Sequence, residues 1–362
     1  MRIMYDVLVI GGGIVGASTA YHLARAGANA MLVDRGDDGR ATSAAAGILA
    51  AKVMGVGHDM QWLTFGAEAD DYYPQLIEQL RADGEAQTGY AVVGMLTVAT
   101  DESQVGMYEH TVAAIRAQHQ RTGIPAEADW HELSAGEAHE RFPLLAPVQR
   151  AFVYTKAARI DGGLIATAMC NAGVKHGLEI KQASAESLII DDDVVRGAVV
   201  DGDAVEARRV VIAGGAWSPH FAAQLGIQIP IEPMRGQIIH LDVPDYDTAG
   251  WPMVEAMNDD YLVPWDDNRI AVGATRELGV GFAPHSTAAG VHRVLSGGLR
   301  AAPGLADASV REIRVGLRPV TTDGSPVVST VPGIDNLFVA AGHGTYGLML
   351  GPYSGKIAAM WA

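Results

Sequence analysis

The sequence contains a single cysteine, Cys170, in 362 residues. One cysteine cannot form an internal disulfide and suits a reducing compartment, so we expect a cytoplasmic protein. Cys170 falls in a helix expected over residues 163–176, where a small buried side chain is a simpler interpretation than a nucleophile. The sequence lacks a run of ~18 apolar residues, so no membrane-spanning helix is predicted, and no signal-peptide pattern precedes the first apolar run.

Basic residues are also scarce. Lysine and arginine number 26 against 42 aspartates and glutamates, which leaves a net charge of −16. Such an acidic chain is a poor partner for nucleic acid or for anionic lipid. The histidines show no spacing typical of metal ligands, so no metal site is predicted. The composition does provide a 49% apolar fraction, in a chain long enough for about two domains of ~150 residues.

The N-terminal segment has the strongest motif. A short apolar strand over residues 5–10 leads into a GxGxxG turn at Gly11, Gly13 and Gly16. In such a turn the first glycine permits the tight bend, the second lets the backbone approach a pyrophosphate, and the third lets the helix pack on the strand. A second strand ends on Asp34, where an acid can accept hydrogen bonds from ribose hydroxyls. The alternative is an ordinary glycine turn, but strands, helix and acid together favour a dinucleotide site.

Glycine follows two later strands in the same way. A strand expected over residues 204–213 ends in Ala213 and Gly214, shortly before Trp217. Another, over residues 337–341, leads into a glycine-rich turn and a final helix that begins near Leu348. Ligands of open α/β sheets bind at the carboxyl ends of strands, so these turns predict parts of one site.

Between these ends the expected strands are longer, as over residues 236–241 and 269–274. We therefore predict an α/β fold (α+β overall), with a Rossmann-like dinucleotide-binding domain and an inserted, mostly antiparallel substrate-binding domain. The expected boundaries are 1–85, 150–230 and 315–362 for the first domain, and 86–149 and 231–314 for the second.

With both glycine turns placed, the chain resembles the FAD-dependent amino-acid and amine oxidoreductase superfamily, which includes glycine oxidase, D-amino acid oxidase and sarcosine oxidase. The segments that carry the resemblance span the chain in order: residues 9–16, 41–49, 211–218, 316–319 with 323–326, and 340–347. A sixth, residues 261–264 with 272–275, is most similar to glycine oxidase.

The resemblance implies FAD as the cofactor. Sarcosine oxidases commonly tether FAD to a cysteine after the arginine–proline segment, but residues 321–324 of this chain contain none, so noncovalent FAD is expected. The residues implied in cofactor binding lie in the two terminal turns and the segments between them: Gly11, Gly13, Ile14, Val15, Gly16, Asp34, Arg35, Thr42, Ser43, Ala44, Gly47, Leu49, Ala213, Gly214, Trp217, Arg318, His343, Gly344, Thr345, Tyr346, Gly347 and Leu348.

The resemblance also implies a substrate site. Glycine oxidase-like enzymes hold the substrate carboxylate with an arginine that matches Arg318, whose guanidinium offers two parallel donors. Tyr261 matches a tyrosine that orients the same carboxylate. Arg276 stands where glycine oxidase has a methionine, and a second cation suits a substrate with two carboxylates. The alternatives are an ion pair for Arg318, a packed aromatic for Tyr261, and pairing of Arg276 with Glu277, Glu255 or another acid. His58 and Tyr346 are weaker candidates for the pocket.

The expected reaction is oxidation of the Cα–N bond of a small amino acid (glycine, a D-amino acid or an N-substituted glycine) to an imino acid, which water hydrolyses. The acceptor is oxygen or another electron acceptor, because the lysine that activates oxygen in sarcosine oxidases has no counterpart in residues 269–272. One alternative is an FAD dehydrogenase of a dicarboxylic or N-carboxymethyl amino acid that reduces a quinone or carrier. A nicotinamide-dependent dehydrogenase and a flavin-binding subunit without turnover are the others. A homo-oligomer is compatible with the sequence.

Overall fold

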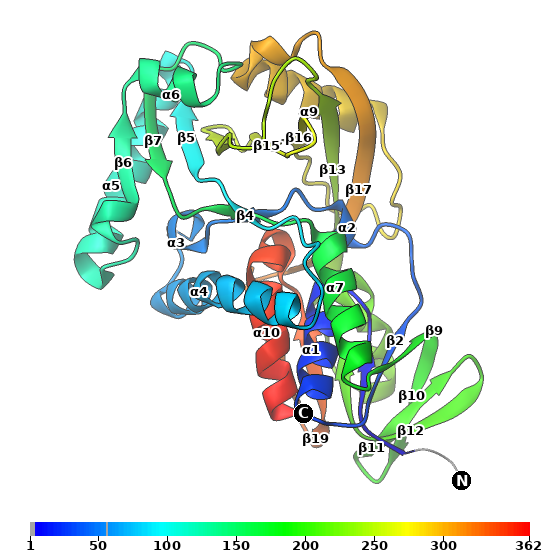
Figure 1. Ribbon diagram of the computed structural model, residues 1–362. Helices are drawn as coiled ribbons and strands as arrows, with labels where there is room; N and C mark the ends of the chain where they lie inside the picture. The colour runs from blue at the N-terminus through cyan, green and yellow to red at the C-terminus, as the bar shows by residue number, and fades with distance from the viewer. Residues whose placement is uncertain (1–3, 56) are drawn as a thin grey trace.

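The computed structural model describes residues 4–55 and 57–362. The chain forms two lobes, each built on an eight-stranded sheet, with a small three-stranded sheet between them (Figure 1). The strands of the small sheet are β3 (Ile48–Leu49), β4 (Ala91–Val92) and β8 (Ala158–Arg159).

The first sheet contains both ends of the chain. Its strands β1, β2, β9, β12 and β19 pair in parallel, and β10, β11 and β18 add antiparallel pairs. These strands are β1 (Met4–Ile10), β2 (Ala30–Asp34), β9 (Glu179–Gln182), β10 (Ala185–Asp191), β11 (Val194–Val200), β12 (Asp203–Ile212), β18 (Val327–Val331) and β19 (Ile334–Ala341).

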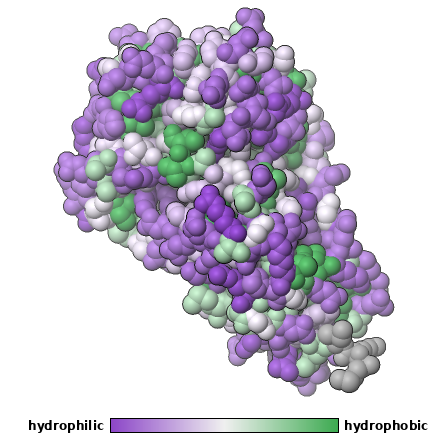
Figure 2. Space-filling model, in the orientation of Figure 1, coloured by the Kyte–Doolittle hydropathy of each residue, from purple (hydrophilic) through white to green (hydrophobic). Residues whose placement is uncertain are grey.

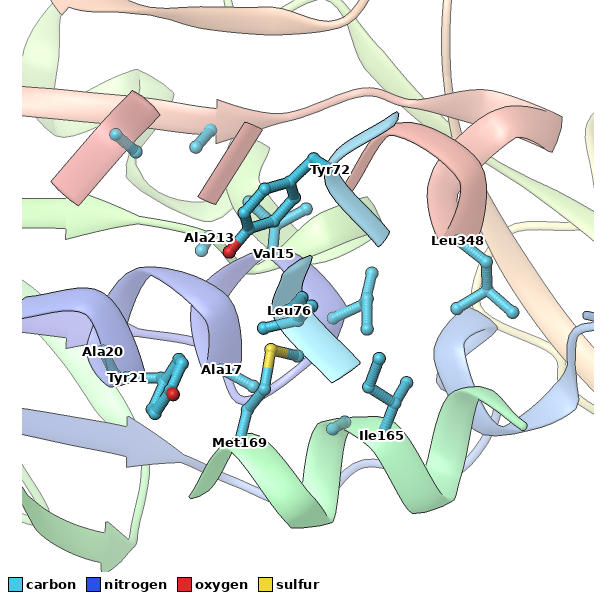
Figure 3. Packing of buried hydrophobic residues seen from close by; sticks show 14 of the residues in the cluster. Val15, Ala17, Ala20, Tyr21, Tyr72, Leu76, Ile165, Met169, Ala213 and Leu348 are labelled. Carbon is cyan, nitrogen blue, oxygen red and sulfur yellow. The ribbon is translucent and has the colours of Figure 1, made fainter. Parts of the chain in front are cut away.

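The main helices of this lobe are α1 (Ile14–Arg25), α4 (Met60–Ala82), α7 (Gly162–Lys175) and α10 (Gly347–Trp361). In Figure 3 side chains from three of these helices, among them Val15, Leu76 and Met169, point toward one another in the core. Burial of such apolar surface is the main stabilising contribution to the fold.

Helices α1 and α10 pack closely because small residues meet at their interface. A Cβ on Gly355 would lie 2.5 Å from the Ser18 Cβ, and one on Gly351 would lie 2.8 Å from Ile14. The Ser18 hydroxyl also donates to the Pro352 carbonyl, at 2.6 Å. The first and last helices of the chain therefore form one unit.

The second sheet is antiparallel except where β14 pairs with β5. In order across the sheet its strands are β17 (Ser309–Thr321), β13 (Ile231–Asp242), β16 (Arg269–Gly273), β15 (Tyr261–Pro264), β14 (Met253–Ala256), β5 (Met95–Ala99), β7 (Arg150–Tyr154) and β6 (Trp130–Leu133). The longer helices of this lobe are α5 (Val105–Thr122), α6 (Ala135–Arg141) and α9 (Ala288–Ala301). Shorter helices are α2 (Ala41–Ala44), α3 (Ala51–Met54) and α8 (Ala222–Leu225).

The predicted fold class is confirmed, and several elements differ in extent. Helix α4 begins at Met60 rather than 66, because the Asp59 side chain accepts a hydrogen bond from the Trp62 N–H, at 2.8 Å, and caps it. The single strand expected over 178–190 is two strands, β9 and β10, at opposite ends of the pairing order. Strands β6, β7 and β18 were not predicted, because short strands show little periodicity.

The expected domain boundaries at 150 and 315 fall at the start of β7 and inside β17. Both strands belong to the second sheet. We propose that the two large sheets are the cores of the two domains.

The face shown in Figure 2 is mostly hydrophilic, with small separate apolar patches. None of the described helices combines the length and apolar character that crossing a lipid bilayer requires.

Candidate active site

A cavity of about 630 Å³ lies between the two large sheets. The carboxyl ends of β1, β2, β12 and β19 form one part of its wall, and residues of β13, β14, β15 and β17 form another. Crevices at the carboxyl ends of parallel strands are the usual ligand sites of such sheets.

The first glycine turn forms one end of the cavity. Gly11 has φ +107°, and a Cβ there would lie 2.5 Å from the Ala213 carbonyl oxygen, so only glycine fits. Gly13 precedes α1 without a side-chain cap, and the first turn of α1 carries no acidic residue. The N–H groups and positive dipole end of α1 are thus available to an anion.

Asp34 lies beside this turn at the end of β2. A Cβ on Gly12 would lie 2.8 Å from Asp34 Oδ2, so the turn and the acid are in close contact. The same oxygen forms an ion pair with Arg40, at 2.6 Å. Arg35 is instead paired with Asp37, at 2.6 Å. Arg40 was not predicted as a site residue, since nothing in its local sequence distinguishes it from a surface arginine.

Most of the expected cofactor residues line this cavity. They are Gly11, Gly13, Ile14, Val15, Asp34, Arg35, Thr42, Ala44, Gly47, Ala213, Gly214, Trp217, Arg318, His343, Gly344, Thr345, Tyr346, Gly347 and Leu348. Three others lie outside its wall. Gly16 packs α1 on β1, since a Cβ there would lie 1.8 Å from the Gly11 oxygen. Leu49 is buried in the core, and Ser43 lines a separate shallow hollow.

The C-terminal glycine turn forms the opposite wall. Helix α10 begins at Gly347 with no side-chain cap and no acidic residue in its first turn, so it presents a second positive dipole end. His343 is buried and its Nε2 lies 2.8 Å from the Ser354 hydroxyl. Burial lowers the pKa of His343 to about 4, which keeps the ring neutral.

Three aromatic side chains meet beside this turn. The His58 ring stacks on Trp62 with centroids 4.4 Å apart, and both contact the Tyr346 ring. His58 Nε2 also lies 3.3 Å from the Tyr346 hydroxyl. Of the two weaker candidates, Tyr346 lines the cavity, whereas His58 contacts Tyr346 without being part of the wall.

The substrate candidates Arg318 and Tyr261 share the wall formed by the second sheet. A Cβ on Gly236 would lie 2.4 Å from Arg318 Cζ, and one on Gly273 would lie 2.4 Å from the Tyr261 hydroxyl. Glycine on the facing strand therefore makes room for each large side chain.

Arg318 donates one hydrogen bond, from Nη1 to the Thr275 carbonyl at 2.8 Å. Among residues 4–55 and 57–362, no acidic side chain forms an ion pair with it. Burial lowers the pKa of Arg318, and burial raises that of Tyr261 while the Arg318 charge opposes the rise. A guanidinium remains charged in proteins, so Arg318 presents unused donors to the cavity.

Arg276 lines the same cavity and is paired with Asp259, with Nη1 and Oδ2 2.8 Å apart. The pair is open to solvent, since the side chains of Arg276 and Asp259 are 46% and 73% exposed. Of the partners that the sequence suggested, Glu277 is paired with Arg235 instead, at 2.6 Å.

Glu255 is a cavity residue that sequence reasoning gave no role beyond pairing with Arg276. It lies in β14, where an acid inside an otherwise apolar strand was the available signal. Burial and the nearby Asp259 raise its pKa to about 7, although Thr97 and Arg276 oppose the rise.

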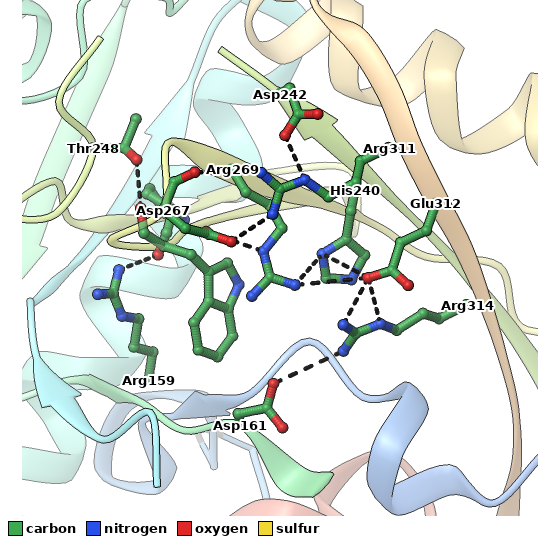
Figure 4. Close-up of polar contacts among 12 residues, drawn as sticks. Arg159, Asp161, His240, Asp242, Thr248, Asp267, Arg269, Arg311, Glu312 and Arg314 are labelled. Atoms are coloured by element: carbon green, nitrogen blue, oxygen red, sulfur yellow. Dashed lines mark hydrogen bonds and ion pairs between the residues drawn. The ribbon is translucent and has the colours of Figure 1, made fainter. Parts of the chain in front are cut away.

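A polar network supports the strand that carries Arg318. Figure 4 shows Arg314, on β17, between Glu312 and Asp161, at 2.6 and 3.9 Å. Glu312 also lies 3.7 Å from Arg269 on β16. Because Asp161 belongs to the lobe of the first sheet, these contacts connect β17 to both lobes. Burial lowers the pKa of His240 in this network to about 3, so that ring is neutral.

Two other residue classes contribute nothing to the site. In the described part of the chain, no group of three or more His, Cys, Asp or Glu side chains could hold a metal ion. Burial raises the pKa of the Cys170 thiol to about 11, and Cys170 is not part of the cavity wall. It therefore lacks the thiolate character of a nucleophile.

Comparison with known proteins gives the same picture for the whole chain. An oxidoreductase of Bacillus subtilis (strain 168), YurR, is 38% identical, over 97% of this chain and 93% of its own. Glycine oxidase of Geobacillus kaustophilus (strain HTA426) is 30% identical over 98% and 92%. The crystal structure of iminodiacetate oxidase from Chelativorans sp. BNC1 superimposes with a TM-score of 0.91, at 38% identity over 98% and 94%.

The family model for FAD-dependent oxidoreductases, named DAO, matches residues 6–361. This range includes both glycine turns and the whole cavity wall. The chain therefore belongs to the DAO family of FAD-dependent oxidoreductases.

Proposed function

We propose that this enzyme oxidises the Cα–N bond of a small amino acid that carries a second carboxylate, such as an N-carboxymethyl amino acid. The observation that carries the proposal is that two guanidinium groups, Arg318 and Arg276, line one cavity. Iminodiacetate oxidase, a relative of the same fold, is named for a substrate with two carboxymethyl arms on one nitrogen.

The cavity fits FAD, the cofactor of the family. Two helix N-termini without side-chain caps, those of α1 and α10, face it from opposite sides. Neither first turn contains an acid that would repel phosphate or a negatively charged ring. We infer that the residues around Gly11, Gly13 and Asp34 hold the ADP part, and that residues 343–348 face the ring. Bound FAD supplies a hydride acceptor for oxidation of the substrate.

Arg318 and Tyr261 orient the substrate in this proposal. Arg318 has donors directed at the cavity, and a carboxylate accepts two parallel N–H groups from a guanidinium. The Tyr261 hydroxyl donates to the same carboxylate. A substrate held at two points presents one Cα–H bond to the cofactor, and such positioning is a large part of catalysis. The imino acid product reacts with water to give a 2-oxo acid and an amine.

Arg276 binds the second carboxylate, which displaces Asp259 from the ion pair. The displacement costs little, because an exposed ion pair contributes only about 0–1 kcal/mol.

We propose oxygen as the electron acceptor, since the named relatives are oxidases. No lysine belongs to the described cavity wall, so oxygen activation here does not use the lysine of sarcosine oxidases. Cytoplasmic location, inferred from the single cysteine, remains part of the proposal.

The decisive experiment is an anaerobic titration of the oxidised enzyme with glycine, sarcosine, acidic D-amino acids and iminodiacetate, followed by the flavin absorbance. We expect the N-carboxymethyl compound to bleach the flavin at the lowest concentration. In air the same substrate should yield one peroxide per turnover. Reduction of an artificial acceptor without peroxide would replace oxygen by a quinone or carrier, and bleaching by glycine alone would refute the dicarboxylate.

Replacement of Asp34 by alanine tests the cofactor end. We expect the dissociation constant of FAD to rise about 10- to 100-fold, because a hydrogen bond to a charged group contributes about 1.5–3 kcal/mol. Fluorescence titration of the apoprotein measures it. The matched control is Asp38→Ala, an exposed acid outside this cavity wall, which should bind FAD normally. Equal affinities for both variants would remove Asp34 from the site.

Replacement of Arg318 by alanine tests the carboxylate anchor. We expect kcat/KM to fall about 10²- to 10³-fold, from the loss of two charge-assisted hydrogen bonds. Stopped-flow reduction of the flavin measures this, and Arg318→Lys should show an intermediate loss. The control Arg81→Ala removes an exposed arginine paired with Glu78. Reduction of the Arg318→Ala enzyme at the normal rate would contradict the assigned role.

Replacement of Arg276 by methionine tests the second anchor. The KM for iminodiacetate should rise about 10- to 100-fold, by loss of a charged contact, while the KM for sarcosine stays within a factor of about three. Steady-state kinetics with both substrates measure the difference. A parallel loss for the two substrates would show that Arg276 supports the fold or the cofactor rather than a second carboxylate.

A further inference from the structure

Glu255 occupies a position beside the proposed carboxylate anchors. It lies in β14, directly opposite Tyr261 of β15 and Thr97 of β5. Directly opposite residues of paired strands point to the same face of a sheet. Glu255, Tyr261 and Thr97 therefore share one face, and Glu255 and Tyr261 both line the cavity.

The Glu255 carboxyl has little support from the protein. Its only recorded hydrogen bond comes from the Thr97 hydroxyl, at 3.5 Å from Oε2. Within residues 4–55 and 57–362, no basic side chain forms an ion pair with it. The titratable and charged groups that face it are Asp259, Arg276, Tyr261 and Tyr346.

Other enclosed acids of this lobe are paired. Asp260 accepts from Arg293 at 2.6 Å and from Arg300 at 3.2 Å. Glu277 accepts from Arg235 at 2.6 Å. An acid with a structural role is neutralised in this way, because an unpaired buried carboxylate is costly. Glu255 instead offers its charge to whatever enters the cavity.

The chemistry of the proposed substrate supplies a partner. An amino acid held through its carboxylates by Arg318 and Arg276 has one remaining charged group, the protonated amine. Departure of a hydride from the adjacent carbon leaves positive charge on nitrogen. The amine must therefore lose a proton first, so that its lone pair can form the C=N bond.

We propose that Glu255 accepts the amine proton of the bound substrate. One N–H bond of the ammonium breaks and one O–H bond forms on the Glu255 carboxylate, with no change in oxidation state. The neutral amine then has the lone pair that oxidation requires. This inference rests on the proposed function, and it adds a general base to a site in which the arginines only position the substrate.

The direction of the pH dependence follows from the environment of Glu255. Burial and Asp259 raise its pKa to about 7, against the effects of Thr97 and Arg276. Below that pH the carboxyl is already protonated and cannot accept the amine proton. Above it the carboxylate is free to act, so the rate of flavin reduction should rise with pH through about 7.

The test compares the wild-type holoenzyme with Glu255→Gln, which keeps the size of the side chain but cannot accept a proton. Anaerobic reduction by iminodiacetate is followed by stopped flow from pH 6 to 10. At neutral pH the variant should be about 10²-fold slower, a typical contribution of a general base. Its rate should recover as the pH approaches the pKa of the amine itself. The control Glu78→Gln changes an exposed glutamate paired with Arg81 and should keep the wild-type profile.

A second measurement does not depend on turnover. Oxydiacetate has an ether oxygen in place of the amine and carries no proton to lose near neutral pH. Its binding, read from the flavin spectrum, should weaken in the wild type as pH rises through 7 and Glu255 ionises. Binding to Glu255→Gln should be independent of pH over that range.

The outcomes separate the two proposals. If the wild type is reduced by iminodiacetate but Glu255→Gln keeps the same pH profile and the same oxydiacetate binding, the role of Glu255 is refuted alone. If neither iminodiacetate nor oxydiacetate affects the wild-type flavin, the dicarboxylate function is refuted, and the role of Glu255 with it. Loss of both pH dependences in the variant supports the proposal.

Discussion

The close packing of α1 against α10 is the constraint on which the rest of the structure depends. Gly351 and Gly355 let α10 approach Ile14 and Ser18 of α1, so the first and last helices lie side by side. Their uncapped N-termini then face one cavity from opposite sides. A cofactor with a pyrophosphate at one end and a ring that gains negative charge at the other matches this pair of positive dipole ends.

The second lobe adds charged side chains to a cavity that the first lobe has shaped for the cofactor. The long β13–β17 ladder places Arg318 over Gly236, and the network around Arg314 connects β17 to Asp161 of the other lobe. The protein as a whole is acidic, with a net charge of −16. Two guanidinium groups at the cavity provide a local exception, which favours an anionic substrate. Glu255 provides the one negative group suited to its amine.

The residues predicted from the sequence are those whose role depends on local chain geometry or on family motifs. Gly11 and Gly13 were found because strand, turn and helix follow one another within a short segment, and they line the cavity. Tyr261 and Arg318 lie more than fifty positions apart and were found only through the resemblance. Arg40 and Glu255 received no site role, because their significance depends on Asp34 and Tyr261, which reach them through tertiary contacts.

The order of residues alone was enough for the fold class, the cofactor and the family, because backbone turns for phosphate binding need glycine at set spacings. Tertiary structure decided which charges face each other. It paired Arg276 with Asp259 rather than with Glu277, left Arg318 without an acid in the described chain, and brought Glu255 to the cavity unpaired. Electrostatic roles depend on distance and burial, and both arise only when strands distant in the sequence form one sheet.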